Sequence, residues 1–147
     1  PQAIGLIDRP TANMQKDQRL SRAVVRHFAY TGHGFVTYGG GLNSVPRMAA
    51  REHVANGLVE KVLDANGESG GIITRHLDRA ARNARAKGSA ILMATTSGKT
   101  LGTILAWSLS SKANGITLAP LSASLLTGLI CSNYLALERE PPLSANT

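Results

Sequence analysis

The chain has 147 residues, of which 43% are hydrophobic and 17% charged, a balance typical of a globular domain. The net charge is +7, but the basic residues are scattered at helical spacing and aromatic residues make up only 4%, so we expect solvated helix faces and no nucleic-acid partner. No apolar run reaches the roughly 18 residues of a membrane span, and the single cysteine, Cys131, excludes an internal disulfide.

Short apolar runs alternate with amphipathic segments along most of the chain. The runs predict five strands, over Ala3–Ile7, Gly34–Tyr38, Leu58–Leu63, Ser89–Met93 and Ile116–Leu118. Asn13 or Asp17 is the expected cap of a first helix, and Asn43 or Ser44 of a short one with Pro46 in its first turn. Two later helices are predicted to bury the stripes Ile73, Leu77, Ala80, Ala84 and Leu101, Ile104, Leu105, Leu109.

Strands that are apolar throughout and alternate with helices indicate an α/β fold with a parallel sheet. We expect one domain over residues 1–137, in which the apolar run Leu121–Leu129 is a possible helix, and a loose tail over residues 138–147. The chain begins at Pro1, which suggests a piece of a longer protein.

The turn after the fourth predicted strand comes close to a phosphate-binding loop. Gly98-Lys99-Thr100 supplies the end of the pattern G-x-x-x-x-G-K-[ST], and a helix N-terminus there would favour phosphate. The first glycine of the pattern is replaced by Met93, however, and no later strand ends in an aspartate that would hold magnesium. A degenerate nucleotide binder at Met93–Thr100 is therefore one alternative.

The order of motifs resembles the later part of the divergent polysaccharide deacetylase family. The resemblance spans about residues 1–126 and is carried by order and spacing. It is densest over Ile72–Ser122, where a helix L-D-R-A-A-x-x-A precedes Gly88-Ser89-Ala90-Ile91, Thr100-Leu101, Trp107 and Leu118-Ala119-Pro120-Leu121-Ser122. It implies part of a distorted (β/α) barrel of the polysaccharide deacetylase type, and carbohydrate metabolism in the periplasm or cell envelope.

The family resemblance also implies a divalent metal and a hydrolytic histidine, and the sequence departs from both. An Asn-Asn-His turn is replaced by Ile7-Asp8-Arg9, and a Gly-His-Pro turn by Ala94-Thr95-Thr96. Threonine cannot replace imidazole as a metal ligand or proton carrier, and arginine places a fixed positive charge where a cation is expected. The four histidines show no metal-ligand spacing, so we predict no metal site and no cofactor, with zinc only if ligands lie before Pro1.

The remaining candidates are polar residues at the predicted strand ends. The candidate catalytic residues are Asp64 and Asp8, and for Asp64 a turn-capping role is an equal alternative. The candidate substrate-binding residues, for which a glycan is the expected partner, are Arg9, Tyr38, Thr95 and Thr96. Trp107 is expected in the core. Whether the protein is an enzyme stays open between a catalytically impaired or glycan-binding form and an active N-deacetylase whose missing ligands precede Pro1.

Overall fold

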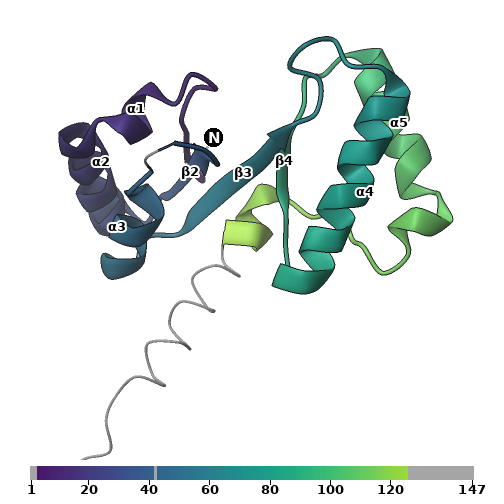
Figure 1. Cartoon of the computed structure of the whole chain (residues 1–147). Helices are drawn as coiled ribbons and strands as arrows, with labels where there is room; N and C mark the ends of the chain where they lie inside the picture. The colour runs from purple at the N-terminus through teal and green to yellow at the C-terminus, as the bar shows by residue number, and fades with distance from the viewer. Residues whose placement is uncertain (1–2, 42, 126–147) are drawn as a thin grey trace, which may run out of the picture.

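The computed structural model describes residues 3–41 and 43–125 (Figure 1). Strands and helices alternate along this part of the chain, and residues 121–125 form a last helical turn. The elements are, in order, β1 (Gly5–Ile7), α1 (Asn13–Lys16), α2 (Gln18–Thr31), β2 (Gly34–Tyr38), α3 (Val45–Arg51), β3 (Asn56–Val62), α4 (Gly70–Lys87), β4 (Ile91–Met93), α5 (Gly98–Ser108) and the 3-10 helix η1 (Ser111–Ala113).

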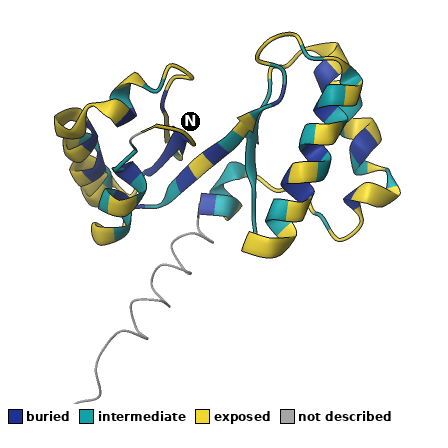
Figure 2. Cartoon of the chain, viewed as in Figure 1, coloured by how far each residue is buried: buried dark blue, intermediate teal, exposed yellow. Residues whose placement is uncertain are grey.

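The four strands form one parallel sheet in the order β1-β2-β3-β4. The helices α2 to α5, which alternate with the strands, cover one face of this sheet. Phe35 of β2 packs with α2 and α3, and Leu92 of β4 packs with α4 and α5. Val36 and Met93, which follow these residues, pack on the opposite face. Figure 2 shows that buried and exposed positions alternate along the helices. Strands in sequence order with helices on a single face are features of an arc of a (β/α) barrel, whereas a doubly wound sheet carries helices on both faces. The predicted α/β class and parallel sheet are confirmed.

The opposite face is covered by the short helical turn of residues 121–125. Leu125 is 3% exposed and packs against Val36, Tyr38 and Val59. Glycine allows the close approach of Leu125, since a Cβ atom on Gly57 would lie 2.9 Å from a Leu125 methyl group and 2.5 Å from one of Ile91, and these side-chain ends would have to shift. A Cβ atom on Gly34 would lie 2.8 Å from the other Leu125 methyl group. Leu125, together with the partly buried Leu121, thus covers this face of the sheet.

The predicted fifth strand, Ile116–Leu118, is wrong. Residues 116–118 form no strand, because the Ile116 N–H is donated to the Ala113 carbonyl in a turn after η1 (2.8 Å) and the Ile116 side chain packs against the α4–α5 cluster. The helix expected from Leu121 is present through residue 125, and the rest of that prediction and the tail 138–147 lie outside the described residues.

The predicted buried stripe of α5 is also wrong in part. Leu101, Leu105 and Leu109 are 50%, 63% and 81% exposed, and Thr100 and Trp107 are buried instead. Two hydrogen bonds turn a different face of the helix toward the protein interior. Thr100 Oγ1 donates to Asp64 (2.7 Å), and Trp107 Nε1 donates to Asp78 of α4 (2.8 Å). Of the other predicted stripe, Ile73, Leu77 and Ala80 are buried.

None of the helices in the described ranges has both the length and the apolar composition needed to cross a membrane.

Candidate functional site

The predicted site residues lie where the parallel strands end, at one edge of the sheet. Asp8 follows β1, Tyr38 ends β2, Asp64 comes soon after β3, and Thr95 and Thr96 follow β4. Because β2 lies between β1 and β3, the two candidate catalytic carboxylates occupy strand ends that are not neighbours. The structure brings Asp64 together with Thr95, and places Asp8 beside the end of β2, where its backbone N–H is donated to the Val36 carbonyl (2.9 Å).

Asp64 joins the end of β3 to the start of α5. Its carboxylate accepts the Thr95 hydroxyl (2.5 Å), the Thr95 backbone N–H (3.0 and 3.1 Å to the two oxygens) and the Thr100 hydroxyl (2.7 Å). The hydrogen bonds from the Thr95 and Thr100 hydroxyls, with that from the Thr95 amide, lower the pKa of Asp64 below its usual value. A carboxylate held in its ionised form by these donors is a poor proton acceptor, so the arrangement favours a structural anchor over a general base.

Two backbone N–H groups of the Met93–Thr100 turn and the Lys99 ammonium are engaged by the chain itself. Ser97 caps α5 by accepting the Thr100 N–H (3.2 Å), and the Thr95 N–H is taken by Asp64. The Lys99 ammonium donates to the Glu68 carbonyl (2.8 Å). A phosphate would have to displace these contacts, so the geometry counts against the nucleotide-binding alternative.

Asp8 serves as a cap for the loop that follows β1. The residue is 6% exposed, and its two carboxylate oxygens accept the backbone N–H groups of Arg9 (2.7 Å) and Gln15 (2.9 Å). Both of these donors are main-chain amides that would otherwise lack a partner near the start of α1. The contacts therefore describe a carboxylate that orders the β1–α1 turn.

Gln15 is a site residue that the sequence analysis missed. Its amide side chain is 1% exposed and pairs with the end of β2 as a neighbouring strand would, donating to the Tyr38 carbonyl (3.1 Å) and accepting the Tyr38 N–H (2.9 Å). Asn43 adds a second donor to the same carbonyl (3.3 Å) and accepts the Val45 N–H at the start of α3 (3.1 Å). A glutamine between Met14 and Lys16 carries no sequence signal for this role, because the pairing joins residues 23 positions apart.

Tyr38 offers little surface to a sugar. Its ring is 8% exposed, it packs in the inner-face cluster with Val36 and Val59, and its hydroxyl lies 3.0 Å from the Met93 sulfur. Burial raises the pKa of the Tyr38 phenol, and the negative charge of Asp8 adds to this. Arg9, Thr95 and Thr96 are exposed at the edge, and their role in binding a substrate stays a prediction.

The residues present do not fit a resident divalent metal ion. In the described part of the chain, no three side chains of His, Cys, Asp or Glu are grouped in a way that could hold one. Asp8 and Asp64 are held by amides and hydroxyls of the chain, and Asp17 caps α2. We therefore derive no reaction step through a metal at this edge.

Comparisons with known proteins agree with the fold class just described. The sequence profile of the divergent polysaccharide deacetylase family matches residues 1–125. The chain belongs to this family. Among solved structures, it is similar to an uncharacterized protein from Agrobacterium tumefaciens C58, with 24% identity and a TM-score of 0.72 over 82% of this chain and 49% of that one. The chain thus spans about half the length of this neighbour. No curated protein matches the sequence.

Proposed function

We propose that this chain is a deacetylase-like glycan-binding unit whose described strand-end edge does not hydrolyse the glycan. The observation that carries the proposal is the engagement of both candidate catalytic carboxylates. Asp64 accepts three hydrogen bonds from Thr95 and Thr100, and Asp8 accepts two from backbone amides. A carboxylate in this state is ionised and already hydrogen-bonded, which suits it to fix a loop better than to accept a proton.

The glycan would meet the exposed polar residues beside these anchors. Arg9 and Thr96 are exposed next to the two ordered turns, on the edge where ligands of parallel α/β sheets bind. Family membership supports a carbohydrate ligand, and it also supports our proposal of an envelope or periplasmic location.

Titration calorimetry with chitin and peptidoglycan oligomers tests the binding part of this proposal. We expect heat that grows with oligomer length and a weaker affinity for the double variant Arg9→Ala/Thr96→Ala. The matched control is Arg75→Ala/Thr117→Ala, which changes two exposed residues of the same types away from the edge. Absence of heat at every length, or an equal loss in the control, would contradict glycan binding at this edge.

The competing proposal is an active metal-dependent N-deacetylase that takes its ligands from residues outside this chain. It is favoured by the family match over residues 1–125 and by this chain covering only 49% of its structural neighbour. Metal analysis and acetate release from the product of the complete gene separate the two proposals. Stoichiometric metal with acetate release would support the competing proposal, and absence of both would oppose it.

A further inference from the structure

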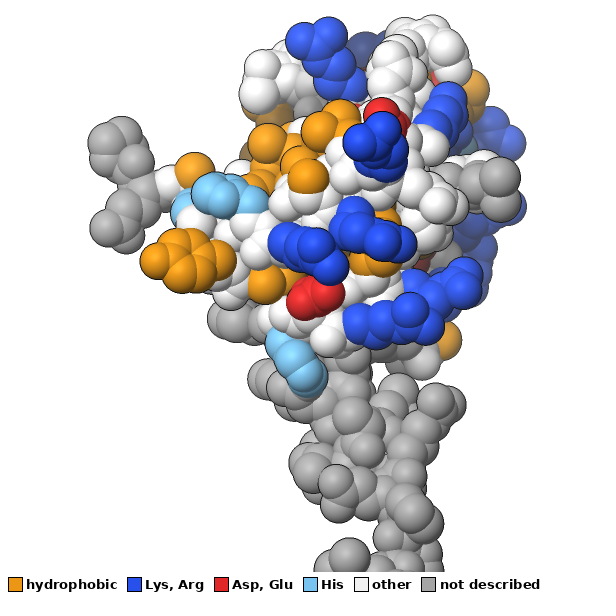
Figure 3. All heavy atoms as spheres, turned by 90° about the vertical axis from the view of Figure 1, so that its left-hand side faces the viewer, with side chains coloured by type: hydrophobic (Ala, Val, Ile, Leu, Met, Phe, Trp, Pro, Cys, Tyr) orange, Lys and Arg blue, Asp and Glu red, His pale blue; other side chains and the backbone are white. Residues whose placement is uncertain are grey.

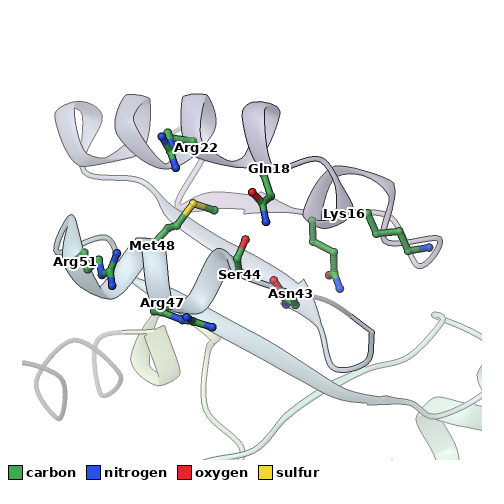
Figure 4. A pocket seen from close by; sticks show the side chains of 9 residues that line it. Lys16, Gln18, Arg22, Asn43, Ser44, Arg47, Met48 and Arg51 are labelled. Atoms are coloured by element: carbon green, nitrogen blue, oxygen red, sulfur yellow. The ribbon is translucent and has the colours of Figure 1, made fainter.

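A groove with cationic walls lies between α2 and α3. Arg22 and Gln18 extend from α2 toward α3, and Met48 of α3 lies between the two helices (Figure 4). Arg47 and Arg51 line the α3 side of the groove. Its main hollow has a volume of about 350 Å³, which is the size of a small-ligand site, and a second hollow of about 140 Å³ continues it past Arg22 and Arg51.

The arginines of this groove are not neutralised by the residues that the structure describes. None of Arg22, Arg47 and Arg51 has an ion pair or side-chain hydrogen bond there; the two described ion pairs are Lys87–Glu60 and Lys112–Asp78. Lysine and arginine side chains gather over the face formed by α1, α2 and α3 with few acidic ones between them (Figure 3). The sequence predicted separate solvated faces, and the fold instead brings the arginines of two helices together.

Two acidic residues lie close to the groove and leave it positive. Glu52 lines the smaller hollow, beside Arg26 and Arg51. The Asp17 carboxylate is used at the start of α2, where it accepts the Arg19 and Leu20 N–H groups (2.9 and 3.1 Å). Like charges held near one another repel, so a bound anion would relieve this repulsion as well as gain its own contacts.

The other lining groups indicate what kind of anion would fit. Guanidinium groups bind carboxylate and phosphate with two parallel hydrogen bonds, and the Gln18 amide, which lines the same hollow, offers a donor and an acceptor suited to sugar hydroxyls. The lining contains no aromatic ring on which a nucleobase would stack. One end of the groove is formed by Gln15 and Asn43, the residues that hold the end of β2, so the groove opens onto the strand-end edge.

We propose that the α2–α3 groove binds an acidic oligosaccharide, a glycan whose sugars carry carboxylate or phosphate groups, through Arg22, Arg47 and Arg51. The inference rests on the proposed function in that the ligand is a glycan, and it adds the charge that selects it. The α2–α3 groove is a surface separate from Asp64 and Thr95, so glycan binding at the groove and at the strand-end edge can be tested independently.

The test measures the affinity of the 147-residue chain for a galacturonic acid hexamer and for a neutral chitin hexamer, at low and moderate salt. The variant is Arg22→Gln/Arg51→Gln. The control is Arg75→Gln/Arg79→Gln on α4, which removes the same charge from two exposed helix arginines. Circular dichroism and thermal melting verify that each variant is folded, as expected for exposed side chains.

We expect the acidic hexamer to bind more tightly than the neutral one, by about tenfold, and its affinity to fall with salt. The groove variant should lose most of this preference, and the α4 control should stay within about twofold of the parent. Equal affinity for the two hexamers, or an equal loss in the control, would overturn the inference while leaving neutral glycan binding intact. A single-stranded oligonucleotide that binds more tightly than the acidic hexamer, and loses affinity in the groove variant, would also overturn it in favour of nucleic acid.

Discussion

Replacement of Gln15 by leucine tests the architecture of the candidate site most sharply. Leucine has a similar volume but no polar atoms, so Gln15→Leu removes both hydrogen bonds to the end of β2. The Tyr38 N–H then has no described partner, whereas the Tyr38 carbonyl keeps the hydrogen bond that it accepts from Asn43. An orphaned buried amide costs about 1–3 kcal/mol and a lost hydrogen bond about 0.5–1.5 kcal/mol. We expect a destabilisation of roughly 2–4 kcal/mol, because Gln15 is almost fully buried and water cannot replace its contacts.

Urea unfolding measures this effect, with Gln18→Leu as the matched control. Gln18 is exposed at the start of α2 and makes no described side-chain hydrogen bond, so its replacement should change the free energy of unfolding by less than about 0.5 kcal/mol. The midpoint should fall for Gln15→Leu with an unchanged slope. If Gln15→Leu unfolds at the same urea concentration as the control, the pairing of Gln15 with β2 does not hold this edge together.

Three further predictions follow from the contacts of the sheet and its edge. The lowered pKa of Asp64 means that the contribution of this carboxylate to stability is present above about pH 4 and is lost as the pH falls through the lowered pKa. Carbon NMR titration should show that the pKa of Asp64 rises in Thr95→Val. An unchanged pKa would refute the role of that hydroxyl. Leu125→Ala should destabilise the fold by about 2–5 kcal/mol in the same urea assay by leaving a cavity on the inner face, whereas a loss below about 1 kcal/mol would mean that the leucine does not seal it. Adenosine or guanosine triphosphate with magnesium should not raise the melting temperature, and a rise that disappears in Lys99→Ala would revive the nucleotide alternative.

The sequence predicted those parts of the fold that depend on local pattern. The strand Gly34–Tyr38 has the predicted bounds, because its apolar residues are continuous and glycines flank it. Asp17 caps α2 as one of the two residues proposed for that role, since the local side-chain bond to Arg19 and Leu20 needs no tertiary partner. Pro46 lies in the first turn of α3, where a missing N–H has no cost.

The parts that could not be predicted depend on contacts between distant residues. Apolar spacing favoured a buried Leu101 and Leu105, yet the rotation of α5 follows the hydrogen bonds of Thr100 and Trp107 to two aspartates more than 25 residues away in the sequence. The same holds for Asp64. Its residue type and position at a strand end suggested chemistry or a local turn, and only the fold reveals that two threonines of the next strand–helix turn donate hydrogen bonds to it.

Acetate release from a chitin hexamer, with and without added zinc, tests the central claim most directly. The claim is that the strand-end edge of this chain binds glycan with carboxylates that are already engaged in holding the edge together. We predict acetate no higher than in the protein-free blank under either condition, from a sample whose binding of the hexamer calorimetry has confirmed. Zinc-dependent acetate release that disappears in Asp64→Asn would contradict the claim, because it would show that this carboxylate takes part in hydrolysis.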